Sequence, residues 1–184
     1  MALERLGKSY GYQKRFEESG VLLRESLAIW ERLQPMLADV VRALFVLANT
    51  QIGRGSLDEA ETLLERADSI ALSLPSKPYR PTISLTRAWV HRERGQAREA
   101  FEAVKPYYAA ALRKRSQVPQ FLTDEDILSF SFTPRFAQTW FLTCFQDLTD
   151  GTASDTLDAA SAILDGKGWV TELMSWRRDL IRSD

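Results

Sequence analysis

The chain is poor in the residues from which most catalytic and metal centres are built. Its 184 residues contain one histidine, His91, and one cysteine, Cys144. A single histidine excludes metal clusters with several histidine ligands, and no serine–histidine–aspartate triad can be assembled around it. The lone cysteine has no partner for an internal disulfide, and its apolar neighbours indicate a buried, unreactive thiol. The sequence therefore predicts a protein that is not an enzyme and holds no metal or cofactor.

Surplus charge and long hydrophobic runs are also absent. The chain has 24 basic and 25 acidic residues and a formal net charge of −1, so no basic excess is available to neutralise the phosphates of a nucleic acid. No apolar stretch approaches the roughly 20 residues of a membrane span. Residues 1–10 lack the apolar core of a signal peptide. We expect a cytoplasmic protein that binds neither nucleic acid nor a membrane.

Small residues recur at fixed intervals along the first part of the chain. Within each of two sets, successive members are 41 and then 40 residues apart. The sets are Gly7, Ala48 and Ala88, and Ser19, Ala60 and Ala100. Repeats of this length are typical of stacked helical hairpins, in which helices that cross closely need small side chains at the crossing. The repetition favours a binding function over catalysis.

The apolar spacing of the first repeat predicts a short helix followed by a longer one. Leu3, Leu6 and Tyr10 share one face of the short helix. Larger side chains such as Leu6 are expected to fill the space between hairpins. The longer helix begins at Phe16 and ends near Pro35, because proline disfavours helix at the residue before it.

Glycine and proline punctuate the second repeat. Its first helix carries an apolar stripe over residues 40–52, and Gly55 suits the left-handed position just after such a helix. Ser56 and Glu59 have the spacing of a capping box for the next helix. That helix is expected to stop before Pro75.

The third repeat follows the same order. Its first helix starts near Pro81, and Gly95 holds the place that glycine holds one repeat earlier. The second helix contains Pro106, where we expect a kink because proline removes a backbone hydrogen bond. Residues 1–112 therefore form three predicted hairpins.

The pattern weakens after residue 112. Residues 113–133 begin with a basic cluster and contain an acidic triplet, so they predict an insertion loop with a short helix. Helical spacing then returns, and residues 134–184 predict a diverged fourth hairpin and a capping helix. Aromatic residues gather between 132 and 145, where core packing is the simpler interpretation and a partner-binding face is the alternative.

These features resemble the tetratricopeptide repeat. The segment 55–60, Gly-Ser-Leu-Asp-Glu-Ala, is the most family-like part of the chain. The period of 40 to 41 residues exceeds the usual 34 and is similar to the long-repeat form of kinesin light chains and many bacterial signalling proteins. The resemblance covers residues 1–112 well and 134–165 weakly. The chain departs from the family at Gln51 and His91, where an aromatic residue is common, and at Arg87, where a large apolar residue is usual.

The resemblance implies an all-α fold, namely a right-handed solenoid of helical hairpins with a diverged C-terminal hairpin and a closing helix. HEAT and armadillo repeats share a similar period and are the alternative. The positions of the small residues and the glycine at the turn fit the tetratricopeptide pattern better.

The resemblance also implies a concave groove, lined by the first helix of each hairpin, that holds a peptide. Family groove positions carried over by the register of small residues are Glu4, Lys8, Tyr12, Arg42, Phe45, Asn49, Leu85, Trp89 and Arg92. The amide of Asn49 can both donate to and accept from a peptide backbone. The guanidinium groups of Arg42 and Arg92 can hold a carboxylate.

We therefore expect a non-catalytic protein–protein interaction module that binds a peptide or protein segment. The chain opens directly on the first repeat, which suggests part of a larger bacterial-type regulatory or signalling protein. One alternative is a self-assembly module, for example a homodimer, that associates through the aromatic C-terminal region. Another is a sensor of a small molecule or signalling peptide, with a pocket between the concave face and the 113–133 insertion.

Overall fold

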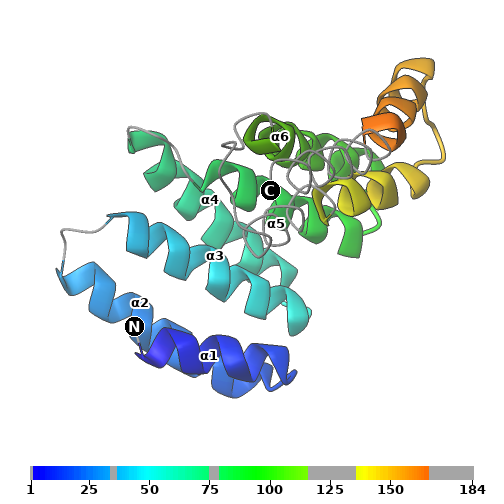
Figure 1. Ribbon diagram of the computed structural model, residues 1–184. Helices are drawn as coiled ribbons and strands as arrows, with labels where there is room; N and C mark the ends of the chain where they lie inside the picture. The colour runs from blue at the N-terminus through cyan, green and yellow to red at the C-terminus, as the bar shows by residue number, and fades with distance from the viewer. Residues whose placement is uncertain (1, 34–36, 75–78, 116–135, 166–184) are drawn as a thin grey trace, which may run out of the picture. The chain divides into compact units, whose positions relative to one another are not determined.

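The computed structural model describes residues 2–33, 37–74, 79–115 and 136–165 (Figure 1). Within these ranges the regular secondary structure is helical and no strand occurs, so the predicted all-α class is confirmed. The chain divides into two compact units, residues 1–107 and 108–184. Each unit is described by itself.

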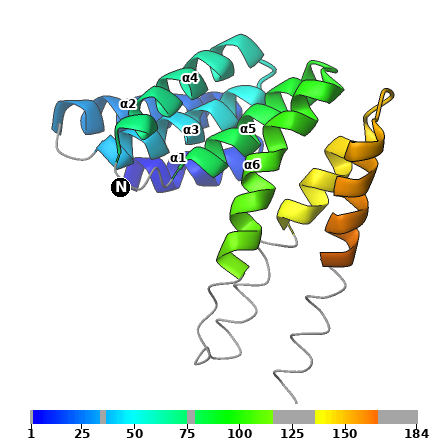
Figure 2. The ribbon, with the colours of Figure 1, turned by 90° about the horizontal axis from the view of Figure 1, so that it is seen from above.

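The first unit is a stack of helical hairpins. The hairpins are α1 (Ala2–Tyr12) with α2 (Phe16–Leu33), α3 (Leu37–Gly53) with α4 (Leu57–Ser73), and α5 (Arg80–Glu93) with α6 (Ala97–Arg115), which continues beyond the unit. From α1 to α5, each helix packs against the next, and the first helices also contact one another, α1 with α3 and α3 with α5 (Figure 2). In the third hairpin the Ser84 hydroxyl donates to the Ala103 carbonyl and joins α5 to α6.

The small residues are buried at the helix crossings, as predicted. Gly7, Ser19, Ala48, Ala60, Ala88 and Ala100 are all buried. A Cβ atom on Gly7 would lie 2.9 Å from Leu23 Cγ, closer than real Cβ contacts allow. The Ser19 hydroxyl donates to the Gly7 carbonyl over 2.8 Å and so fixes the crossing of α1 and α2. Larger residues at matched positions, Leu23, Leu64 and Val104, are fully buried between the hairpins.

Leu6 does not fill such a space, and this prediction was wrong. Its side chain is 45% exposed, whereas Leu47, one repeat later, is 2% exposed. Leu47 belongs to α3, which packs against α2 of the preceding hairpin. In the part of the chain that the structure describes, no hairpin covers the equivalent side of α1. The buried residues of α1 are instead Glu4 and Gly7.

The turn within each of the three hairpins contains one residue in the left-handed conformation. Gly55 and Gly95 have φ angles of 79° and 70°, and Lys14 has 60°. These three positions are 41 and 40 residues apart, as the small residues are. After each of them a backbone amide closes the end of the helix, for example Ser56 N to Gln51 O at 2.9 Å and Arg15 N to Tyr10 O at 2.9 Å. This bond pattern is the Schellman motif, which favours glycine at its left-handed residue.

Replacing Lys14 by glycine is expected to raise the free energy of unfolding by about 1 kcal/mol, because a left-handed backbone is strained for a residue with a Cβ. Gly55→Ala should lower it by a similar amount, since no atom lies within 4 Å of the added Cβ and only the backbone cost remains. Urea unfolding followed by circular dichroism measures both variants. Equal stability of Lys14→Gly and the parent would contradict the expectation.

The predicted capping box at the start of α4 was wrong. Ser56 is the N-cap residue, but its side chain makes no capping hydrogen bond, and its backbone angles, φ −84° and ψ 65°, are not extended. A capping box also needs the N-cap backbone amide as a donor to the glutamate. That amide already donates to Gln51 O, and Glu59 lies 3.4 Å from the Arg24 guanidinium. The backbone amide that a capping box needs is therefore used by the turn, and its glutamate is paired with the neighbouring hairpin.

In the second unit, helices span residues 136–146 and 153–165. The Gln138 side chain donates to the Ala162 carbonyl over 2.7 Å and joins them. Phe141 stacks on Tyr108 with ring centroids 4.7 Å apart. Cys144 is buried, as predicted. Most of the predicted insertion and the predicted closing helix lie outside the described residues.

A capping box does occur in this unit, at Thr152 and Asp155, which have the same spacing as Ser56 and Glu59. Thr152 N donates to Asp155 Oδ2 over 2.9 Å, and Asp155 N donates to Thr152 Oγ1 over 3.2 Å. The reciprocal pair satisfies free amides at the start of helix 153–165. In the first unit, α6 continues through Pro106, and the predicted kink there stays a prediction.

Candidate functional site

A cavity of about 350 Å³ lies in the first unit, on the side formed by the first helices of the hairpins. Residues of α1, α2, α3 and α5 line it: Lys8, Gly11, Tyr12, Phe16, Phe45, Val46, Asn49, Thr50 and Trp89. Five of the nine groove residues predicted from the sequence are in this set, namely Lys8, Tyr12, Phe45, Asn49 and Trp89. The structure thus brings together one predicted residue pair from each of α1 and α3 with a single residue of α5.

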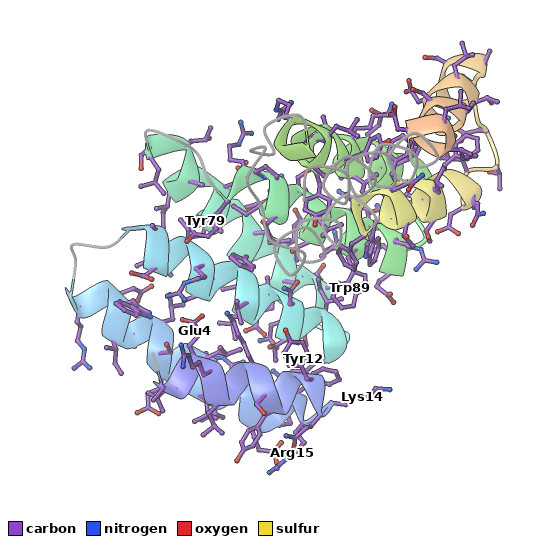
Figure 3. All side chains as sticks on the ribbon, in the orientation of Figure 1. Glu4, Tyr12, Lys14, Arg15, Tyr79 and Trp89 are labelled. Atoms are coloured by element: carbon purple, nitrogen blue, oxygen red, sulfur yellow. The ribbon has the colours of Figure 1, made fainter. Side chains whose placement is uncertain are left out.

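Much of the cavity wall consists of four aromatic rings, those of Tyr12, Phe16, Phe45 and Trp89. Tyr12 is 88% exposed at the end of α1, and Trp89 lies on α5 (Figure 3). The Trp89 indole donates to Glu93 Oε1 over 3.0 Å, which orients its ring. The Phe45 ring lies 5.9 Å from the Tyr79 ring, and this contact braces it from the side of α5. Such a wall favours an apolar ligand group.

Asn49 is the polar group of the cavity with no fixed role in the fold. Its side chain is half-buried and has no hydrogen-bond partner among the described residues. Thr50 differs, because its hydroxyl donates to Val46 O over 3.3 Å and lies 3.2 Å from Ser19 Oγ. The Asn49 amide is open to solvent and is therefore free to donate to and accept from a ligand.

Glu4 and Arg42 do not line the cavity but belong to a charge cluster beside it. The Glu4 side chain is 3% exposed, and its Oε1 lies 2.9 Å from Lys8 Nζ and 3.2 Å from Arg42 Nη1. Arg42 also pairs with Asp39. The second oxygen of Glu4, Oε2, is buried without a hydrogen-bond partner. Two cations and two carboxylates balance, so the charge beside the cavity is close to zero.

The turn next to the cavity is held by Arg15. Its guanidinium donates to Glu18 Oε1 over 3.0 and 2.9 Å and lies 4.2 Å from the centre of the Tyr10 ring. The hydrogen bonds from Arg15 hold the pKa of the Glu18 carboxyl below its usual value. This contact joins the end of α1 to the start of α2 and places Phe16 at the cavity.

Residues 1–73, which comprise α1 to α4, match the sequence model of the tetratricopeptide repeat family. This part of the chain consists of tetratricopeptide repeats. The family comprises non-catalytic scaffolds that generally mediate protein–protein interactions. A comparison with curated protein sequences gives no match.

The third hairpin lies outside the family match but keeps the tetratricopeptide register. Ala88 and Ala100 are buried at its crossing, and Gly95 closes its turn in the left-handed conformation. The first unit as a whole is therefore a solenoid of the tetratricopeptide type, as predicted. Three helices of the family-matched residues are long, with 18 residues in α2 and 17 in each of α3 and α4. These lengths agree with the long repeat period.

The departures from the tetratricopeptide pattern are accommodated by polar contacts. Gln51 is fully buried and its Oε1 accepts from Arg54 Nη1 over 3.0 Å, although Nε2 has no partner. His91 Nδ1 lies 2.8 Å from Gln96 Oε1 at the turn. Arg87 pairs with Glu61 at 3.2 Å.

The remaining predicted groove residues lie apart from the cavity. Leu85 is half-buried on α5 and Arg92 is exposed on the same helix, and neither lines it. Phe16 lines the cavity but was not predicted. The family groove positions lie on the first helix of each hairpin, whereas Phe16 begins α2, a second helix. Its place directly after the first turn, close to Tyr12 in the sequence, is the signal that could have identified it.

Neither a metal cluster nor a membrane-spanning helix occurs in the part of the chain that the structure describes. Nowhere in residues 2–33, 37–74, 79–115 and 136–165 do three or more histidine, cysteine, aspartate or glutamate side chains gather closely enough to hold a metal ion. None of the described helices is long and apolar enough to span a membrane.

Proposed function

We propose that the first unit binds an extended peptide or protein segment along α1, α3 and α5, and that a large uncharged side chain of this segment enters the cavity. The unpartnered amide of Asn49 is the observation on which this proposal depends. An extended backbone offers one donor and one acceptor per residue, which is what a carboxamide can pair with. Binding would therefore use an amide that makes no hydrogen bond within the fold.

The walls and charges of the cavity support an apolar ligand side chain. A volume of about 350 Å³ lies near the lower end of the range for ligand pockets, roughly 300–1,000 Å³, and suits side chains rather than a folded domain. Lys8 is already paired with Glu4 at 2.9 Å, so its charge is largely compensated. The aromatic rings offer large contact areas to a leucine, phenylalanine or tryptophan side chain.

A random peptide library displayed on phage tests the proposal and does not require the natural partner to be identified. Selected peptides are expected to be enriched in leucine, phenylalanine or tryptophan at one position. Trp89→Ala should weaken the selected peptides about tenfold or more, and Asn49→Ala about five- to tenfold, as measured by fluorescence anisotropy.

Arg92→Ala is the matched control, because Arg92 lies on the same helix as Trp89 but outside the cavity. It should leave the affinity within about twofold. If Arg92→Ala abolishes binding while Trp89→Ala and Asn49→Ala do not, the ligand lies elsewhere on the concave face. The wider expectations, membership of a larger regulatory protein and self-association, stay predictions.

A further inference from the structure

The two contacts between successive hairpins share one ion pair, Arg54 with Glu17 in the first and Arg94 with Asp58 in the second, but differ in chemistry at three other equivalent positions. The first seam joins α2 to α3, and the second seam joins α4 to α5. Three matched positions of the first seam are apolar and buried: Leu27, Val40 and Leu47. One repeat later, at steps of 41, 40 and 40 residues, the second seam has charged residues at these positions: Asp68, Arg80 and Arg87.

The charged residues of the second seam pair across it. Arg80 Nε lies 3.1 Å from Asp68 Oδ1, Arg87 Nε lies 3.2 Å from Glu61 Oε1, and Arg94 Nη2 lies 2.6 Å from Asp58 Oδ1. Second contacts link neighbouring pairs, Arg87 to Asp68 at 4.0 Å and Arg94 to Glu61 at 3.7 Å. We call the residues Asp58, Glu61, Asp68, Arg80, Arg87 and Arg94 the ion ladder.

The geometry of α5 brings Arg80 and Arg87, with Arg94 directly after the helix, to one face. They are spaced by seven residues, which is close to two helical turns. The carboxylates lie on α4 in the opposite order, with Asp58 facing Arg94 at one end and Asp68 facing Arg80 at the other. The ladder thus runs along most of the contact between α4 and α5.

Ion pairs of this kind hold a seam less firmly than buried leucines, and they respond to salt. The side chains of Arg80, Arg87 and Arg94 are partly exposed, and partly exposed pairs contribute little and are screened by added ions. Glu61 Oε2 is buried but accepts no hydrogen bond, which lowers the gain further. Ile83 and Val90 also bury apolar surface on α5, and this contribution is not weakened by screening.

The second seam positions one wall of the cavity. Trp89 lies on α5, whereas the other lining residues belong to α1, α2 and α3. We propose that the ion ladder is a salt-sensitive closure that holds α5, and with it Trp89, against the cavity. Screening of the ladder loosens the third hairpin and opens that wall. This inference depends on the packing of the helices and not on the identity of any ligand.

Hydrogen–deuterium exchange of the full chain at 20 mM and 1 M KCl tests the closure. Backbone amides of α5 are expected to exchange about three- to tenfold faster at 1 M KCl, because the pairs are screened. Amides of α3, which the first seam covers mainly with apolar side chains, should change by less than about twofold. The same factor for both helices, or no change in α5, would overturn the proposal.

A triple variant copies the first seam into the second. Asp68→Leu, Arg80→Val and Arg87→Leu together place at these positions the residue types that the first seam has, and they should abolish the excess salt dependence of α5 exchange. The control is Glu31→Gln with Arg66→Gln, which removes an ion pair of 2.6 Å between α2 and α4 outside the ladder. It should leave the salt dependence of α5 unchanged. If the triple variant keeps the excess salt dependence of α5 exchange and the control loses it, the ladder is not the cause of that dependence.

Spin labels across the mouth of the cavity test the movement of the wall. In a Cys144→Ser background, labels on Gln13→Cys and Arg92→Cys report the distance between the end of α1 and α5 by pulsed electron paramagnetic resonance. Both positions are exposed. The distance distribution should broaden toward longer distances at 1 M KCl and stay unchanged in the triple variant. An unchanged distribution in the parent would refute the opening of the cavity wall.

Discussion

Leu64→Ala is expected to lower the free energy of unfolding by about 3 kcal/mol, because it removes a fully buried side chain and leaves a cavity between hairpins. Leu64 is 0% exposed and belongs to the core cluster of the first unit. Its equivalents, Leu23 and Val104, are buried in the hairpins before and after. Urea unfolding followed by circular dichroism at 222 nm, a wavelength set by helix content, measures the loss.

Leu72→Ala is the control for this change, because it deletes the same atoms from the same helix. Leu72 is 48% exposed, and its replacement should cost less than about 0.5 kcal/mol. A similar loss in the two variants would mean that the repeat register does not distinguish buried from exposed positions on α4. The stack as described would then be incorrect.

Gly7→Val is expected to destabilise the first hairpin by about 2–3 kcal/mol through overpacking. Even a Cβ at this position would lie 2.9 Å from Leu23 Cγ and 3.4 Å from Ser19 O. Valine adds two further methyl groups at the point where α1 crosses α2. The hydrogen bond from Ser19 Oγ to Gly7 O, 2.8 Å long, would be stretched or broken as the helices separate. Thermal and urea unfolding of the variant measure the effect.

Gly20→Ala provides a control of opposite sign. Gly20 is a buried residue inside α2, and an added Cβ would lie 3.5 Å from the nearest atom, an Arg24 side-chain nitrogen, which is an ordinary contact. Alanine is the better helix former, so this variant should gain about 0.5–1 kcal/mol. A loss at Gly20 as large as that at Gly7 would show that close approach of α1 and α2 is not the reason for glycine at Gly7.

The helices and turns of the first unit were predictable because their signals are local. Gly55 and Gly95 end helices in the left-handed conformation, and Pro75 follows closely on the end of α4. The period of small residues then predicted the hairpins, since each small residue marks a crossing within one repeat. The left-handed Lys14 was not predicted because a lysine carries no turn signal, although its place in the register is that of the glycines.

Other features depend on what lies across a hairpin boundary, and there the predictions failed or were silent. Leu6 has the same position in its repeat as Leu47 but a different degree of burial. Ser56 and Glu59 have the spacing of a capping box, but the turn takes the amide and Arg24 takes the carboxylate. Arg87 departs from the family pattern, and its role became clear only from Glu61 and Asp68 on the neighbouring helix.

The order of residues along the chain predicted the hairpins, their register and, through the family resemblance, the helices on which groove residues were expected. It could not establish which of nine candidate side chains meet, because spacing along one helix does not report the distance to the next. Packing brought Tyr12, Phe45 and Trp89 to one cavity, neutralised Glu4 between Lys8 and Arg42, and gave the second seam its ion ladder. Those outcomes depend on contacts between residues far apart in the chain, where burial and pairing are settled only by the folded neighbour.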